Sequence, residues 1–454
     1  MFDSWPAVLR LQQWLVRARS SHWGELILRS GTVLLVRVAG AGLGFAFNVA
    51  LARQLGADGL GVYHLALTFV LIASVVGRLG MDATILKFGA TSHSAQDGIR
   101  LAEVHRLGMS TAALGCGVVA AATFLAANGL AAVVYGDPAI AQPLRLMSLG
   151  LVPFALLHLY GELLKAGHRQ ALSSFIQGAA LPLVSLLLLL VGARYLSHAD
   201  GAAAIYLAAN ILVCALAYFW WRRSLPPIQP TTTPAIGWRR LLATAMPMYG
   251  AAMADVIMTF SDVLILGLFV STAEVGIYTA AARTALLTRF LLLANSAVAA
   301  PRFAALHAAN DRPGLARLAL RSTLLTTVAS VPLLLILIAF PEQILSIFGP
   351  QFEAGAQVLI ILSIGQFVNA ATGPVGYLLN MSGLHRIEGR IAVAGALLGV
   401  ALSFALIPGW GMLGAAAANA IATAACNLLR VYFAKSRLGI LMLPIPDRMR
   451  SPRT

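Results

Sequence analysis

The sequence predicts an all-α integral membrane protein with about twelve transmembrane helices in two six-helix lobes. The mean hydropathy is +0.82, and 59% of the residues are hydrophobic against 11% charged, far from a soluble chain. Of the 32 Lys and Arg, 24 fall in every second gap between apolar stretches, and the other side receives only Arg53, Arg145 and Arg194. Because basic residues beside short loops are retained in the cytoplasm, both termini are predicted to be cytoplasmic.

The predicted spans each approach the roughly 20 apolar residues that cross a bilayer. The stretches 181–192 and 331–340 are almost purely apolar, whereas 143–163 and 354–380 are interrupted by Pro, Gly, Glu or Asn. The twelve spans are 30–52, 60–81, 107–128, 143–163, 171–193, 202–221, 242–269, 275–299, 322–340, 354–380, 390–407 and 411–433.

Short motifs recur along the chain at a nearly constant offset, a little under half of its length. Gly61-Val62-Tyr63 matches Gly276-Ile277-Tyr278, and Lys87-Phe88 matches Arg302-Phe303. Two further pairs keep the register: Tyr135-Gly136 with Phe348-Gly349, and Gly167-His168-Arg169 with the stretch 383–386. Six spans in each half start and end on the same side, so the repeats are parallel and related by an axis along the membrane normal.

This repeat divides the chain into five parts. The Pro- and Thr-rich stretch 222–241 is too polar to span the membrane and reads as a cytoplasmic linker. The predicted parts are a cytoplasmic interfacial segment 1–29, a first lobe 30–221, the linker, a second lobe 242–434 and a basic tail 435–454. Within the first part, 5–23 mixes Trp and Leu with Arg, which favours an amphipathic helix on the membrane surface over a flexible tail.

Five arginines lie inside predicted spans, where a charge is costly unless it faces a cavity or a partner. Arg78 and Arg430 sit near cytoplasmic ends and are expected to extend into the headgroups. Arg37 and Arg283 are deeper, and Arg289 lies six residues, or about 240°, further round the helix than Arg283. Either these three arginines line a cavity, or they pair with acids or bond backbone carbonyls.

Asp255 and Asp262 are seven residues apart and therefore share a face of the seventh span. One of them is a candidate partner for an arginine, and either is a candidate ion-coupling site. Glu162 and Lys165 are predicted to form an interfacial pair. The amide side chains inside spans either line a cavity and hydrogen-bond sugar hydroxyls or bond neighbouring helices; they are Asn48, Asn295, Gln366, Asn369 and Asn380.

Patterns typical of catalysis are absent from the sequence. No HExxH metal motif or GxxxxGK[ST] phosphate loop occurs, and Cys116, Cys214 and Cys426 lie inside spans without metal-ligand spacing. The loops predicted outside the cell are too short to hold an active site. The net charge of +15 is spread over cytoplasmic clusters, which orientation and anionic lipids explain without nucleic acid. We expect no enzyme activity, no cofactor and no metal.

Three stretches carry a family resemblance that extends over roughly residues 30–435. LARQLGADGLGVYHLALTF (51–69), SDVLILGLFVSTAEVGIYTAAAR (261–283) and LLKAGHR (163–169) resemble the polysaccharide-transporter proteins. These are the oligosaccharide flippases of the multidrug/oligosaccharidyl-lipid/polysaccharide superfamily. The resemblance implies a V-shaped pair of bundles in the bacterial inner membrane that works by alternating access.

The implied cargo is an undecaprenyl-diphosphate-linked oligosaccharide, moved from the inner to the outer leaflet for O-antigen, capsule or exopolysaccharide, together with polymerase or ligase partners. Guanidinium groups suit a diphosphate, so Arg37, Arg283 and Arg289 are the candidates for it, with Asn48, Asn295 and Asn369 as neutral cavity residues. A lipid II flippase is disfavoured because those proteins have fourteen spans. A multidrug or metabolite antiporter that couples through Asp255 or Asp262 is the alternative, and a scaffold that transports nothing is a third possibility.

Overall fold

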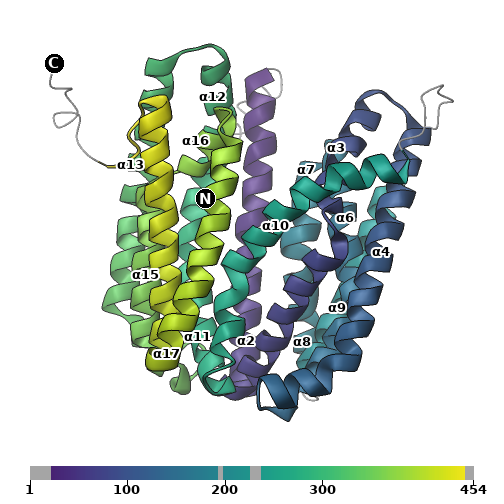
Figure 1. Cartoon of the computed structure of the whole chain (residues 1–454), viewed down its shortest axis with the longest axis vertical. Coiled ribbons are helices and arrows are strands. Elements are labelled where there is room, and N and C mark those ends of the chain that lie inside the picture. Colours follow the sequence, from purple (N-terminus) through teal and green to yellow (C-terminus); the bar gives the residue numbers. More distant parts are fainter. Residues whose placement is uncertain (1–21, 193–197, 225–236, 445–454) are drawn as a thin grey trace, which may run out of the picture.

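The computed structural model describes residues 22–192, 198–224 and 237–444, and every regular element in these ranges is helical (Figure 1). The all-α prediction is confirmed. Most of the predicted interfacial stretch 5–23, most of the linker 222–241 and the tail beyond residue 444 lie outside the described residues.

The first half of the chain folds into one group of helices. These are α2 (His22–Arg78), α3 (Met81–Ser94), α4 (Gly98–Gly129), η1 (Leu130–Val134), η2 (Pro138–Ile140), α5 (Ala141–Leu149), α6 (Leu151–Ala166), α7 (Gln170–Ser174), η3 (Phe175–Ala180), α8 (Leu181–Gly192) and α9 (Ala199–Arg222).

The second half repeats this arrangement. Its helices are α10 (Trp238–Leu266), α11 (Thr272–Ala285), η5 (Leu286–Thr288), α12 (Arg289–Ala308), α13 (Arg312–Ala339), α14 (Pro341–Leu345), η6 (Pro350–Gly355), α15 (Ala356–Ala371), α16 (Val375–Met381) and α17 (His385–Leu438).

The described helices account for about twelve crossings of a membrane. Nine of them are long and apolar enough to span, and the bent pair Pro138–Leu149 and Leu151–Ala166 makes a tenth. Two of these ten contain a break at a glycine with positive φ, Gly56 in α2 (φ 70°) and Gly411 in α17 (φ 53°). Glycine adopts such angles without steric cost, so the chain can turn back within one continuous run of helix (Figure 1). This count agrees with the predicted number of spans.

The basic stretches 87–106 and 302–321, which fall between predicted spans, are largely helical. Only 95–97 and 309–311 form the turns, and they are built alike: Gln96 and Asn310 both have φ 54°. Asp97 accepts a hydrogen bond from the Arg100 amide at 2.9 Å, and Asp311 one from the Gly314 amide at 2.8 Å. The helices therefore extend beyond the apolar core of the membrane. The two turns are 214 residues apart, one fewer than the 215 residues that separate the repeated motifs.

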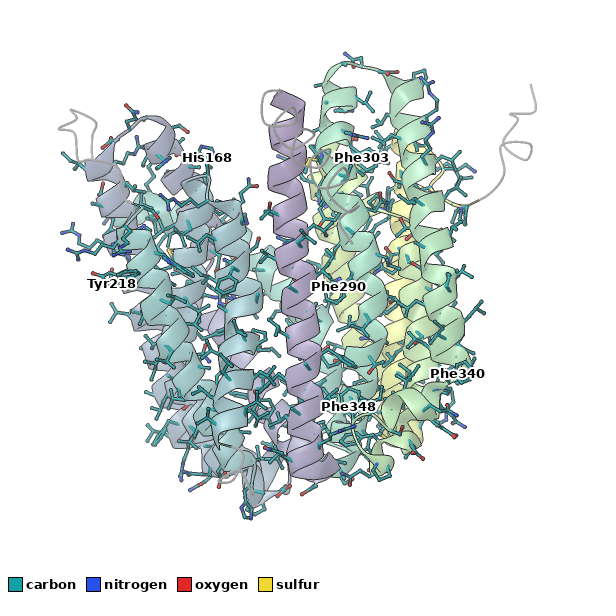
Figure 2. All side chains as sticks on the ribbon, turned by 180° about the vertical axis from the view of Figure 1, so that it is seen from behind. His168, Tyr218, Phe290, Phe303, Phe340 and Phe348 are labelled. Carbon is teal, nitrogen blue, oxygen red and sulfur yellow. The ribbon has the colours of Figure 1, made fainter. Side chains whose placement is uncertain are left out.

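Two ends of the molecule can be distinguished. The basic end carries the turns 95–97, 167–169, 309–311 and 382–384, and the far end carries Gly56, 135–137, 267–271, 340–355 and Gly411. Figure 2 shows His168 and Phe303 toward the first end and Phe340 and Phe348 toward the second.

The lobes share one core at the far end and have separate cores toward the basic end. The shared core joins Leu51, Leu60 and Tyr63 of α2 to Tyr278 of α11 and Phe348. Each of the other two cores is built mostly from one half of the chain. The two groups of helices accordingly diverge toward the basic end (Figure 1).

A close backbone approach of the lobes joins two glycines that the repeat relates. A side chain on Gly61 would overlap the carbonyl oxygen of Thr272, and one on Gly276 would overlap that of Ala57. The same offset in the sequence relates Ala57 to Thr272 and Gly61 to Gly276. The contact is therefore symmetric, and the pseudo-two-fold axis passes through it.

Helix α10 packs on both lobes. Its residues Leu241 and Ala245 are buried in the core of the first lobe, and Trp238 Nε1 donates to Thr111 Oγ1 at 3.3 Å. Val263, near the other end of α10, belongs to the shared core. Pro247 lies between the two parts, where its missing N–H breaks the regular hydrogen bonding of the helix.

Candidate substrate cavity

A cavity of about 360 Å³ opens on the inner face of the second lobe. Its walls come from α10, the run α11–η5–α12, α15 and the second part of α17, and the first lobe contributes Thr68. In the register of the repeat Thr68 corresponds to Arg283, so equivalent positions of the two halves face the same space. In volume and in its mixed polar lining the cavity suits a small polar group.

Two carboxylates line the cavity, as their seven-residue spacing predicts. Asp262 is buried and accepts hydrogen bonds from Tyr278 Oη at 2.6 Å, Asn419 Nδ2 at 2.9 Å and the Val263 amide at 2.8 Å. Asp255 is exposed to the cavity. One acid is therefore fixed by three donors, and the other is open.

Two arginines of the cavity have no carboxylate partner among the described residues. Arg283 ends α11 and is half-buried, and Arg289 begins α12 and is exposed. The 3₁₀ turn η5 lies between them and advances the helix by about 120° per residue instead of 100°, which brings Arg289 about 60° closer to the face of Arg283. Both line the cavity with their charge available to an anion.

Arg430 also lines the cavity, but it is paired. Its Nη2 lies 2.7 Å from Glu388 Oε1, with side chains only 17% and 14% exposed. Arg78 is likewise paired, with Asp82 at 3.0 Å. The expectation that these two arginines extend into the headgroups is wrong, because each finds an acid close by in the fold.

The remaining predicted residues are distributed unevenly. Asn369 lines the cavity. Asn48 and Asn295 do not: Asn48 bonds the Gly44 carbonyl and His64, and Asn295 Nδ2 donates to the Ser322 carbonyl and to Thr326 Oγ1, each at 2.8 Å. Arg37 is exposed on the first part of α2, which runs between the two groups of helices (Figure 2).

Several lining residues were not singled out from the sequence. They are Thr68, Thr259, Asn419, Thr423 and Asn427. A signal existed in the last span, where Asn419, Thr423 and Asn427 follow one another at intervals of four in an Ala-rich stretch and so lie on one helix face.

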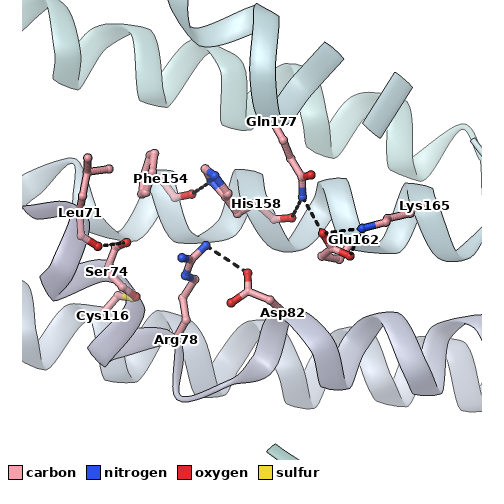
Figure 3. A network of polar contacts seen from close by, with 10 residues as sticks. All are labelled: Leu71, Ser74, Arg78, Asp82, Cys116, Phe154, His158, Glu162, Lys165 and Gln177. Carbon is pink, nitrogen blue, oxygen red and sulfur yellow. Dashed lines mark hydrogen bonds and ion pairs between the residues drawn. The ribbon is translucent and has the colours of Figure 1, made fainter. Parts of the chain in front are cut away.

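The first lobe holds a second polar network, away from this cavity (Figure 3). Gln177 Nε2 donates to the His158 carbonyl and to Glu162 Oε1, both at 3.0 Å, and Lys165 Nζ lies 3.3 Å from Glu162. The Glu162–Lys165 pair agrees with the sequence interpretation. Since its members bond one another, this network links helices and offers no open charge to a ligand.

The sequence matches the family model described as polysaccharide biosynthesis protein over residues 28–307, well over half of the chain. The chain belongs to this family. Residues 247–405 of this polysaccharide biosynthesis protein also match the MatE model. The family resemblance expected from the sequence is thereby confirmed, and the chain is a multi-pass membrane protein of the superfamily that includes both.

Relatives and solved structures agree with this assignment. A probable low-salt glycan biosynthesis flippase, Agl15 of Haloferax volcanii, is 24% identical over 424 residues, covering 92% of this chain and 85% of the relative. The lipid II flippase MurJ in an inward closed conformation superposes with a TM-score of 0.72 at 15% identity, covering 90% of this chain and 87% of MurJ. An inward-facing multidrug transporter of the MATE family also gives 0.72, at 12% identity, with coverages of 89% and 98%. Both structures share the two-lobed fold of this chain.

Proposed function

We propose that this protein moves an undecaprenyl-diphosphate-linked oligosaccharide from the inner to the outer leaflet of a bacterial inner membrane. The observation that carries the proposal is the pair Arg283 and Arg289, whose guanidinium groups line a cavity without a carboxylate partner among the described residues. A diphosphate carries negative charge that a bidentate guanidinium group binds well in a site shielded from water. The name of the relative Agl15, a glycan biosynthesis flippase, points the same way.

The proposed orientation places the basic end in the cytoplasm, with both termini there. In that orientation the described conformation is closed toward the outside by the shared core and open toward the cytoplasm. Alternating access would then separate the lobes at the Gly61–Gly276 contact and bring them together at the basic end. Arg37, on the part of α2 that runs between the lobes, is proposed to meet the headgroup as it enters.

The test is the lipid-linked glycan pool of a deletion strain, sorted by membrane leaflet. Trapping of the undecaprenyl-diphosphate oligosaccharide on the cytoplasmic side, with loss of the surface polymer, is the expected result. Complementation with Arg283→Ala should fail while the protein still inserts, and Arg317→Ala, which removes an exposed arginine of α13, is the matched control. An unchanged pool with normal polymer would reject the proposal.

The alternative is an antiporter for drugs or metabolites. It is favoured by the MatE match over 247–405, which contains both cavity acids, Asp255 and Asp262. In that case the deletion strain would keep its polymer and become sensitive to exported compounds. Asp→Asn substitution at both acids would reproduce that sensitivity.

A further inference from the structure

The polar groups of the cavity are divided between its walls. The groups with free charge stand on α10 and on the run α11–η5–α12. The facing helices α15 and α17 carry neutral amides, which we name the amide wall: Gln366, Asn369, Asn419 and Asn427. Gln366 and Asn369 are three residues apart in α15, and Asn419 and Asn427 are eight residues apart in α17. Each pair therefore lies on one face of its helix.

Much of the hydrogen-bonding capacity of the amide wall is unused. Gln366 Oε1 is buried and has no hydrogen-bond partner among the described residues, and the side chain of Asn369 has none either. Asn419 Nδ2 donates to Asp262 at 2.9 Å, and its oxygen remains free within the described part of the chain. Asn427 is bonded at both ends, because its Nδ2 donates to the Thr423 carbonyl at 2.9 Å and its Oδ1 accepts from Arg430 Nη1 at 3.4 Å. An unpaired amide inside a membrane span is costly, so this wall favours a polar occupant, either water or a polar part of the cargo.

The chemistry of the wall selects the kind of occupant. A free carboxamide presents a donor and an acceptor side by side, which is what a sugar hydroxyl or an acetamido group also presents. The wall has no net charge of its own, in contrast to Arg283 and Arg289, which suit an anion. Polar sites of this type discriminate strongly, because an analogue that lacks the hydrogen-bonding group leaves the buried amide unpaired.

We propose that the amide wall is the subsite for the first sugar of the cargo, centred on Gln366 and Asn369, while the arginines hold the diphosphate. The inference rests on the proposed function and deepens it. Because all four amides belong to the second lobe, the proposed subsite moves with that lobe when the lobes rock.

The experiment compares two probes with the full chain in lipid nanodiscs: undecaprenyl diphosphate, and the same lipid carrying one N-acetylhexosamine. Wild-type protein should bind the glycosylated probe about tenfold more tightly, the factor given by roughly one net hydrogen bond. Gln366→Met and Asn369→Leu, which keep size and lose hydrogen bonding, should each bring that ratio close to one without weakening the bare lipid. Arg283→Gln should weaken both probes and leave the ratio unchanged.

The outcomes separate the two proposals. If wild-type protein binds both probes equally, the subsite is wrong and the flippase proposal stands; this arm needs no variant and does not depend on whether a variant folds. If Gln366→Met and Asn369→Leu bind the bare lipid normally and keep the tenfold ratio, the subsite lies elsewhere. If wild-type protein binds neither probe, the proposed function fails and the subsite fails with it.

Discussion

Tyr278 Oη donates a 2.6 Å hydrogen bond to Asp262, sixteen residues earlier, and His64 Nε2 lies 3.0 Å from Asn48, again sixteen residues earlier. Each contact joins the first pair of spans of its lobe. In the register of the repeat, however, Tyr278 and Asp262 correspond to Tyr63 and Phe47, whose rings meet edge to face with centroids 6.4 Å apart. Both halves therefore join these two spans at the same place, but the carboxylate stands in the second lobe, where the first lobe has a phenyl ring.

The charge of Asp262 gives the first prediction. Asp262→Asn should cost about 1–3 kcal/mol of stability, because one of its three donors would meet an NH₂ group. Asp255→Asn, on the same helix and exposed to the cavity, should leave stability unchanged. Thermal unfolding in detergent measures both. Flipping in proteoliposomes under an imposed proton or sodium gradient then tests coupling, and retention of gradient dependence in both variants would exclude these acids as coupling sites.

The glycine contact between the lobes gives the second prediction. Gly276→Val should destabilise the described conformation by about 1–3 kcal/mol, since the new side chain would overlap the backbone of Ala57 and force the lobes apart. Spin labels across the far end should report a wider separation, and transport should fall. Gly117→Ala, in a helix position with open space around it, is the control. An unchanged far-end distance would mean that the lobes do not close through this contact.

The partly buried pair Arg430 and Glu388 gives the third prediction. Removing one partner, as in Glu388→Ala, should cost about 2 kcal/mol because the largely covered guanidinium group of Arg430 would lose its counter-charge. The double substitution Glu388→Ala with Arg430→Met should recover much of that loss. Unfolding of the two single variants and the double variant completes a thermodynamic cycle. Additive effects would show that the two groups do not stabilise one another.

The two repeated turns give the fourth prediction. Asp97→Ala and Asp311→Ala should each destabilise the chain by about 1 kcal/mol, because each carboxylate caps the first turn of a helix. Asp→Asn at either position should cost much less, since an amide oxygen can still accept the backbone hydrogen bond. Thermal unfolding distinguishes the two substitutions. Equal losses for Ala and Asn would assign the effect to charge and not to the cap.

Much of the fold follows from the sequence, because a bilayer imposes a length and a hydropathy that local composition reveals. The paired glycines 61 and 276 could be aligned from the motif alone. The helical structure of 87–106 and 302–321 could not be predicted from hydropathy. Hydropathy detects only the stretch inside the apolar core of the membrane, and α4 and α13 continue beyond it. Nor does hydropathy show that α2 and α17 turn back at single glycines without leaving the helix.

The cavity was harder to predict than the fold. Asp255 and Asp262 could be placed together because seven residues complete two turns. Asn295 was misleading, since a polar side chain in a span can serve a neighbouring helix as well as a cavity, and only the packing of α12 on α13 distinguishes the two. Arg289 depended on the 3₁₀ turn before it, a change of pitch that the Leu-Leu-Thr sequence does not reveal.

The symmetry of the Gly61–Gly276 contact bears on how such a chain could arise. A surface that meets its own equivalent across a two-fold axis is what two copies of a half-length protein would use to form a homodimer. Gene duplication and fusion would then preserve an interface that already worked. The two copies could afterwards diverge. The first half would keep side chains that only link its helices, and the second half would acquire the charges and amides of the cavity.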